Sequence, residues 1–295
     1  IVLDPMYGVS RTALQTILIT ARCEVDVIHQ RHDPLFGGKL PAPNMQTLGA
    51  LRHFVLEQRC DLGIATDGDA DRLGIIDDEG NFVHPNKILV LLYYYLMQYK
   101  GLRGPAVRNV STTHLLDKIA EDFGQKCYEV PVGFKHISAA MEAHQALIGG
   151  ESSGGLTVRG HIPGKDGIYA GTLLVEMLAL TGQSLSALYR EIEERYGSFE
   201  MAERDYRFTA EDKKRIQKRL FADKELPELP FPPEKVSYKD GLKLYFENGG
   251  WLSARFSGTE DLLRIFAEMP ALEKAEALIA ILADFLDLED SGRVL

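Results

Sequence analysis

Residues 62–76 read Leu-Gly-Ile-Ala-Thr-Asp-Gly-Asp-Ala-Asp-Arg-Leu-Gly-Ile-Ile, in which two apolar stretches flank a run of three alternating aspartates. The apolar stretches predict two short buried strands, and the residues between them predict a turning loop. Carboxylates two residues apart in such a loop can converge on one point, where they would repel one another without a cation. An all-oxygen ligand set favours Mg²⁺, with Mn²⁺ as a substitute, so Asp67, Asp69 and Asp71 are candidate metal ligands.

Two other interpretations of this aspartate loop are a calcium-binding EF-hand and a solvated acidic turn. An EF-hand requires Gly at its sixth position and Glu at its twelfth. Counted from Asp67, those positions hold Arg72 and Asp78, so the sequence excludes an EF-hand. The acidic turn stays open, although the flanking strands and the adjoining Arg72 favour the metal site.

Strand and helix patterns alternate on both sides of the aspartate loop. Upstream, residues 1–3 and 25–28 predict strands, with an amphipathic helix between them and a second helix after Asn44. The alternation starts again at Pro105, with strands at 106–110, 127–130 and 146–148 and helices at 115–123, 136–144, 167–180 and 184–196. Strands that alternate with helices predict parallel sheets in layered α/β domains.

The composition changes after Tyr206. Residues 226–233 contain four prolines, which is too many for a regular element and predicts a connector. Beyond it, strands are predicted near 242–247, 251–255 and 263–267, followed by a C-terminal helix that carries Leu278 and Phe285. We therefore predict an α/β fold with two similar layered α/β domains with mixed sheets, at 1–103 and 104–205, and a smaller C-terminal α+β domain at 206–295.

Composition excludes several classes of protein. The 295 residues are 45% hydrophobic and 26% charged, which is ordinary for a globular protein and excludes a disordered or collagen-like chain. The net charge of −10 makes binding to nucleic acid or to an anionic membrane unfavourable. The longest apolar run, Ile88 to Met97, is well short of the about 20 residues that span a membrane. Three cysteines without a C-x-x-C pair indicate a reducing, cytoplasmic location.

A second candidate loop, Arg255-Phe256-Ser257-Gly258-Thr259-Glu260, lies between two predicted strands. Its hydroxyl groups, flexible glycine and backbone N–H groups can wrap a phosphate. Arg255 and the nearby Arg264 can add charge and paired hydrogen bonds. An ordinary hairpin turn has a similar composition and remains an alternative.

A third loop, Gly149-Gly150-Glu151-Ser152-Ser153-Gly154-Gly155, follows a predicted strand. Small residues let a ligand approach the backbone, and Glu151 and Ser153 could hydrogen-bond neighbouring sugar hydroxyls. A flexible glycine loop is the alternative. Two further loops place Lys135 and Lys165 just before helices, where an anion could bind, although each could be an ordinary surface lysine.

Together and in this order, these motifs resemble those of the α-D-phosphohexomutase family, the phosphoglucomutases and phosphomannomutases. The resemblance covers nearly the whole chain. Residues 67–72 are similar to the family's Mg²⁺ loop, residues 151–155 to its sugar-recognition loop, and residues 255–260 to its phosphate-binding loop. Residues 132–135 and 165–167 resemble the phosphoglucomutase-like branch.

The family is built from four domains, and the resemblance implies that this chain corresponds to domains two, three and four. In the family, domain one carries a phosphorylated serine in a Ser-His-Asn-Pro-like loop. The nearest string here, at 111–114, lacks the Asn-Pro, and the chain starts abruptly at Ile1. We therefore expect a fragment that lacks domain one and is inactive alone.

The resemblance implies reversible transfer of a phosphoryl group between C1 and C6 of a hexose phosphate, with glucose the expected sugar and glucose 1,6-bisphosphate the intermediate and activator. By the same implication, the aspartates hold Mg²⁺, Arg72 stabilises the transferring phosphoryl group, and Lys135 assists acid–base chemistry or contacts phosphate. The implied substrate-binding residues are Glu151, Ser153, Lys165, Asp166, Arg255, Ser257, Gly258, Thr259 and Arg264.

The sequence departs from the family pattern at several positions. Ser152 stands in the middle of the sugar-recognition loop, Gly155 stands where some members have His, and Phe256 and Asp261 stand where Pro is usual. Losing the prolines makes the phosphate-binding loop less preorganised. The alternative functions are a phosphosugar-binding module without turnover and, more weakly, a metal phosphatase, for which no nucleophile or base is evident. Glucose versus mannose preference and oligomeric state stay open.

Overall fold

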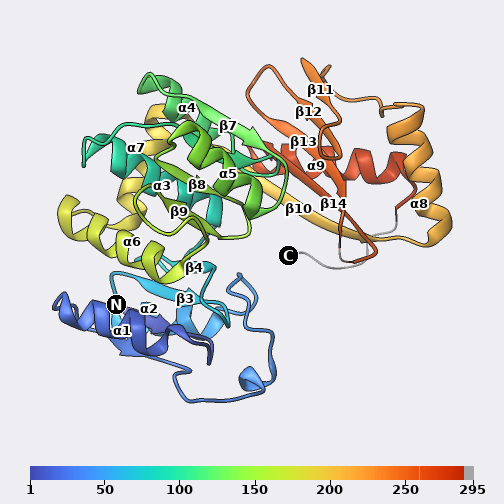
Figure 1. Ribbon diagram of the computed structural model, residues 1–295. Helices are drawn as coiled ribbons and strands as arrows, with labels where there is room; N and C mark the ends of the chain where they lie inside the picture. The colour runs from blue at the N-terminus through green and yellow to red at the C-terminus, as the bar shows by residue number, and fades with distance from the viewer. Residues whose placement is uncertain (259, 289–295) are drawn as a thin grey trace. The chain divides into compact units, whose positions relative to one another are not determined.

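The computed structural model describes residues 1–258 and 260–288 (Figure 1). The chain forms two compact units, residues 1–196 and residues 197–295. The N-terminal unit contains two α/β layers, and the C-terminal unit is an antiparallel sheet covered by helices. The predicted fold class of two layered α/β domains with mixed sheets and a smaller α+β domain is confirmed.

The first sheet of the N-terminal unit has the strand order β2-β1-β3-β4-β5. Its strands are β1 (Val2–Asp4), β2 (Asp26–Val27), β3 (Gly63–Thr66), β4 (Leu73–Ile76) and β5 (Phe82–Val83). The first three run parallel, while β4 and β5 are antiparallel additions. The accompanying helices are α1 (Ser10–Thr20), the short turn η1 (Phe36–Gly38) and α2 (Gly49–Gln58).

The second sheet has the order β7-β6-β8-β9, with three parallel strands and an antiparallel β9. Its strands are β6 (Ala106–Asn109), β7 (Cys127–Val130), β8 (Ile148–Gly150) and β9 (Leu156–Val158). The helices of this part are α3 (Pro85–Gln98), α4 (Leu115–Asp122), α5 (Phe134–His144), α6 (Gly167–Thr181) and α7 (Leu185–Tyr196). Strand order and direction match those of β2-β1-β3-β4, so the loop from β3 to β4 and the loop from β8 to β9 occupy equivalent places.

Helix α6 joins the two layers of the N-terminal unit. It packs on α1 and β4 of the first layer and on α3 and β9 of the second. The apolar run from Ile88 to Met97 forms most of α3 and is buried within this unit. Within the described residues, no single helix has the length and composition to cross a membrane; α6 and α7 pass that test only jointly, as a pair bent by 82°.

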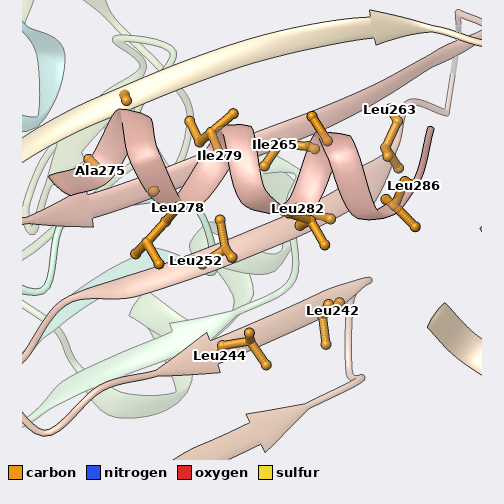
Figure 2. Packing of buried hydrophobic residues seen from close by; sticks show 14 of the residues in the cluster. Leu242, Leu244, Leu252, Leu263, Ile265, Ala275, Leu278, Ile279, Leu282 and Leu286 are labelled. Carbon is orange, nitrogen blue, oxygen red and sulfur yellow. The ribbon is translucent and has the colours of Figure 1, made fainter. Parts of the chain in front are cut away.

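The C-terminal unit has a five-stranded antiparallel sheet in the order β10-β14-β13-β12-β11. Its strands are β10 (Glu200–Arg207), β11 (Lys235–Ser237), β12 (Leu242–Tyr245), β13 (Trp251–Phe256) and β14 (Leu262–Met269). The helices are α8 (Ala210–Ile216), its π-helical continuation η2 (Gln217–Ala222) and α9 (Leu272–Phe285). Figure 2 shows Leu278 and Leu282 of α9 within a core that includes Leu244 and Leu252 of the sheet.

Strand β10 was not predicted from the sequence. It carries Glu200, Glu203, Arg204 and Asp205, so it lacks the apolar alternation of a half-buried strand. It nevertheless pairs with β14 along its whole length. The predicted domain boundary at 205/206 therefore falls inside β10, and the boundary at 103/104 falls between α3 and β6.

Candidate functional site

The aspartate loop connects the antiparallel strands β3 and β4, whose last paired residues are Thr66 and Leu73. Ala70 donates its N–H to the Asp67 carbonyl at 3.1 Å and adopts a left-handed conformation with φ of 62°. This turn brings the side chains of the three aspartates toward one another. One carboxylate oxygen from each of Asp67, Asp69 and Asp71 lies within 4.8 Å of the other two.

Asp67 is the most buried carboxylate of the three, at 2% exposed. Burial raises its pKa, the charges of Asp71 and Asp69 raise it further, and bonds to Arg72 oppose the rise. Arg72 donates its backbone N–H to Asp67 Oδ1 at 3.0 Å and its Nε–H to Oδ2 at 2.8 Å. Arg72 thereby offsets part of the negative charge in the loop.

The two carboxylate oxygens of Asp71 differ in their hydrogen bonding. Its Oδ1 is buried without a hydrogen-bond partner among the described residues, although Arg72 Nε lies 3.5 Å away. Its Oδ2 lies 2.6 Å from Lys165 Nζ. Three convergent carboxylates, one partly buried oxygen without a hydrogen bond and only oxygen donors suit a hard divalent cation such as Mg²⁺.

Two helix N-termini hold the backbone of the aspartate loop. Val9, which precedes α1, donates its N–H to the Gly68 carbonyl at 3.1 Å, and Gly167, which begins α6, donates to the Ala70 carbonyl at 2.9 Å. A Cβ on Gly8 would lie 2.6 Å from the Gly68 carbonyl oxygen, which leaves no room for a side chain there. Local sequence patterns do not reveal these supports, because they depend on contacts between distant segments.

The loop of residues 151–155, predicted above to be a sugar-recognition loop, connects β8 and β9. Glu151 donates its N–H to the Gly155 carbonyl at 3.0 Å, and Gly154 donates to the Glu151 carbonyl at 3.1 Å. The Ser153 hydroxyl donates to Glu151 Oε1 at 2.9 Å. The structure therefore brings Glu151 and Ser153 together, with the serine exposed and the glutamate half-buried.

Asn109 is a candidate site residue that was not predicted from the sequence. Its Oδ1 accepts hydrogen bonds from the Ser111 N–H at 2.9 Å and the Thr112 hydroxyl at 2.8 Å. These bonds fix the amide so that Nδ2 donates to Glu151 Oε2 at 3.4 Å. Asn109 ends β6 beside β8, and ligands bind at the carboxyl edge of parallel strands, which is the signal that could have revealed it.

The remaining candidates of the N-terminal unit have different surroundings. Asp166 caps α6 by accepting the Tyr169 N–H at 2.9 Å, and its Oδ2 lies 2.8 Å from His161 Nε2. Lys165 reaches Asp71 as described above. Lys135 is exposed at the start of α5 and makes no hydrogen bond or ion pair with another described residue. Lys165 is therefore adjacent to the metal candidates, whereas Lys135 is free to meet a ligand.

The predicted phosphate-binding loop of the C-terminal unit lies between β13 and β14. Ser257 donates its N–H to the Leu262 carbonyl at 2.8 Å, and its hydroxyl accepts the Glu260 N–H at 3.3 Å. A Cβ on Gly258 would meet no atom of the described residues within 4 Å, so there is open space on that side of the glycine. Thr259, the remaining predicted loop residue, lies outside the described residues.

Two arginines flank this hairpin. Arg255 and Arg264 are directly opposite each other in the register of β13 and β14. Arg255 Nε donates to Asp240 at 3.1 Å, and Arg264 donates to Glu260 at 3.0 Å. Arg255 and Arg264 therefore place two positive charges next to this hairpin, and the carboxylates of Asp240 and Glu260 offset part of that charge.

Phe256 occupies the position where the family resemblance leads one to expect Pro. Its ring makes an edge contact with Phe208 at 5.3 Å between centroids and lies 6.0 Å from Phe221. Aromatic packing therefore supports the loop where a proline would have restricted it. Beside it, a hollow of about 220 Å³ is lined by Arg207, Phe208, Glu260, Asp261 and Leu262.

Comparison with known proteins covers almost the whole chain. Three models of phosphoglucomutase/phosphomannomutase domains match it: alpha/beta/alpha domain II at residues 1–80, alpha/beta/alpha domain III at 84–196, and the C-terminal domain at 199–285. A phosphoglucomutase/phosphomannomutase of Thermococcus kodakarensis is 31% identical over 285 residues, which are 95% of this chain and 59% of that protein.

Two further similar proteins differ in the sugar that their names give. A protein assigned as a phosphoglucosamine mutase in Methanosarcina barkeri is 33% identical over 268 residues, 91% of this chain and 58% of that protein. A crystal structure assigned as a phosphomannomutase of Thermus thermophilus superimposes with a TM-score of 0.81 at 30% identity. That alignment covers 97% of this chain and 60% of the other.

Proposed function

The chain belongs to the phosphoglucomutase/phosphomannomutase family, and we propose that it forms the metal-, sugar- and phosphate-binding parts of an enzyme that interconverts hexose 1-phosphate and hexose 6-phosphate. The chain spans about 50–60% of the length of the curated relatives it matches. The observation that carries the proposal is the convergence of Asp67, Asp69 and Asp71 beside Lys165. Glucose is the expected sugar.

The aspartate loop would serve phosphoryl transfer. Asp67, Asp69 and Asp71 would hold Mg²⁺, which supplies charge neutralisation at a transferring phosphoryl group. Arg72 is bound to Asp67 through Nε, and its side chain is 43% exposed. The exposed part of this side chain can therefore contact the same phosphoryl group.

The other loops would bind the substrate. Glu151 and Ser153 would hydrogen-bond two sugar hydroxyls, with Asn109 orienting the glutamate. Arg255, Ser257, Gly258, Thr259 and Arg264 would bind the phosphate that does not react. Lys135, Lys165 and Asp166 would complete the substrate contacts.

The reaction needs a phosphoserine, and no Ser-His-Asn-Pro-like loop occurs in these residues. In the proposed reaction, a phosphoserine from a further domain transfers its phosphoryl group to the free C6 or C1 hydroxyl. That hydroxyl loses its proton and the serine oxygen gains one, and Lys135 is the candidate for assisting this acid–base exchange or for contacting the phosphate. The hexose bisphosphate then returns its other phosphoryl group to the serine. By itself, the chain of 295 residues would bind the sugar phosphate without turnover.

Binding is tested by calorimetric titration of the chain with glucose 1,6-bisphosphate in the presence of Mg²⁺, with free glucose as the control ligand. We expect saturable binding of the bisphosphate only. Glu151→Gln should weaken this binding, whereas Glu247→Gln, which changes an exposed carboxylate of the other unit, should not. Equal binding of glucose, or no effect of Glu151→Gln, would contradict the site assignment.

Turnover is tested separately, with the chain joined to a phosphoserine domain from a relative. Glucose, mannose and glucosamine 1-phosphates are supplied in turn, because relatives carry all three names. Interconversion of one sugar phosphate would support the mutase. Binding without interconversion of any of the three would favour a phosphosugar-binding module.

A further inference from the structure

Lys165 connects the aspartate loop to the sugar-recognition loop within the N-terminal unit. Its ammonium group lies 2.6 Å from Asp71 Oδ2. Its alkyl chain crosses Gly155, so closely that a Cβ built on that glycine would lie 2.2 Å from Lys165 Cδ and 2.7 Å from Cγ. One side chain therefore contacts both loops at once.

The two carboxylates next to Lys165 belong to different loops. The Cβ position of Gly155 that its alkyl chain fills is also 3.5 Å from Glu151 Oε1. Glu151 is therefore adjacent to the middle of the lysine side chain, while Asp71 is at its end. Rotation of the last bonds of a lysine requires no movement of the backbone.

We propose that Lys165 is a positioning residue whose ammonium group competes with the divalent cation for Asp71, and that cation binding redirects it to the sugar-recognition loop. This inference rests on the proposed metal role of the aspartate loop. A cation bound at Asp71 would neutralise the carboxylate that pairs with the ammonium group and would repel that group. Because the alkyl chain is held beside Gly155, the released group stays close to Glu151.

If Lys165 competes with the cation, removing its charge should strengthen metal binding. Lys165→Met keeps a side chain of similar length and removes the ammonium group, which competes with the cation for Asp71 and also repels it. We expect Mn²⁺, titrated alone and followed by electron paramagnetic resonance, to bind about three- to tenfold more tightly to this variant. Misfolding cannot produce this result, because it would weaken binding.

Two further variants sharpen the test. Gly155→Ala places a methyl group where the lysine chain lies, and the flexible chain must move away from Asp71, so this variant should also bind Mn²⁺ more tightly. Lys165→Arg keeps the charge and should bind as the wild type does. Lys100→Met is the matched control, because it removes another 2.6 Å lysine–carboxylate pair, with Glu176, in the same unit.

The outcomes separate the inference from the proposed function. No Mn²⁺ binding by the wild type would overturn both. Wild-type binding with unchanged or weaker affinity in Lys165→Met would overturn the inference alone and leave the aspartate loop as a metal site. Tighter binding in Lys165→Met and Gly155→Ala, but not in Lys100→Met, is the result that the inference requires.

Discussion

At the scale of single residues, two carboxylates of the aspartate loop differ in their surroundings: Asp67 is buried and Asp71 is partly exposed. Asp67 is tied to Arg72 by two hydrogen bonds, whereas Asp71 has one oxygen without a hydrogen bond among the described residues. Asp71 therefore has more capacity left for a cation than Asp67 has. The raised pKa of Asp67, caused first by burial, indicates that its ionised form requires further stabilisation.

Asp71→Asn is the direct test of the metal site. The amide keeps the shape of the side chain but loses a negative charge, so Mg²⁺ and Mn²⁺ affinity should fall by about tenfold or more. Calorimetric titration of each cation measures this change. Asp61→Asn, in the exposed turn before β3, is the control and should leave affinity unchanged; equal loss in both variants would show a general charge effect.

Gly167 tests the backbone support of the same loop. A Cβ there would lie 2.7 Å from the Arg72 carbonyl oxygen and 3.0 Å from that of Ala70, and backbone atoms cannot move aside cheaply. Gly167→Ala should cost about 1–3 kcal/mol of unfolding free energy and weaken metal binding. Denaturant unfolding measures the first effect. Gly164→Ala, whose Cβ would meet nothing within 4 Å, should be close to wild type.

At the scale of elements, two equivalent hairpins carry the two functional loops of the N-terminal unit. The β3–β4 connection holds the aspartates and the β8–β9 connection holds Glu151. In both sheets, the loop follows the third parallel strand, at the carboxyl edge where ligands are usually bound. Helix α6 contacts both layers, which explains how Lys165, just before that helix, reaches both loops.

The contact between α3 and α6 makes a contribution to folding stability that depends on pH, and the pKa of Glu176 gives its direction. Burial raises the pKa of Glu176, but hydrogen bonds from Lys100 and Tyr95 outweigh it, so the pKa lies below its ordinary value of 4.5. A lowered pKa in the folded state stabilises the protein above pH 4.5, and this contribution is lost as pH falls through the folded-state value.

Glu176→Gln should remove this contribution. At pH 7 the variant should melt about 1–3 °C below the wild type, because the pair is partly exposed and therefore weak. The difference should shrink as pH falls below 4.5, where the wild-type glutamate becomes protonated. Thermal melting followed by circular dichroism across this pH range measures the melting-temperature difference and its change with pH. A difference that grows in acid would contradict the stabilising role of ionised Glu176.

At the scale of the whole molecule, each compact unit has its own core. The core of the C-terminal unit consists of residues between Ala202 and Leu286. The single tryptophan, Trp251, lies in β13 of this unit. Its fluorescence therefore reports the unfolding of the C-terminal unit.

Leu278→Ala should lower the unfolding midpoint seen by tryptophan fluorescence. Leu278 is 1% exposed in α9, and truncating such a leucine costs about 2–5 kcal/mol. Leu14→Ala, at a fully buried position of α1 in the other unit, should leave the fluorescence midpoint in place. If both variants shift that midpoint equally, the two units unfold as one.

The sequence by itself predicted the α/β class, the order of the loops and the residue types at each of them. These features depend on local patterns: apolar alternation, glycine-rich turns, and aspartates spaced two apart. The resemblance to a known family rested on the same short motifs and is confirmed by the domain matches. Strand β10 was not predicted, because its charged residues interrupt the alternation of apolar and polar residues. Its pairing with β14 establishes it as a strand.

The tertiary structure decided which distant residues meet. The approach of Lys165 to Asp71, of Asn109 to Glu151, and of Gly167 to the aspartate-loop backbone joins segments far apart in the chain. No local pattern encodes such contacts, because they depend on how whole sheets and helices pack. The candidate site residues could therefore be predicted from the sequence, whereas the contacts between their loops could not.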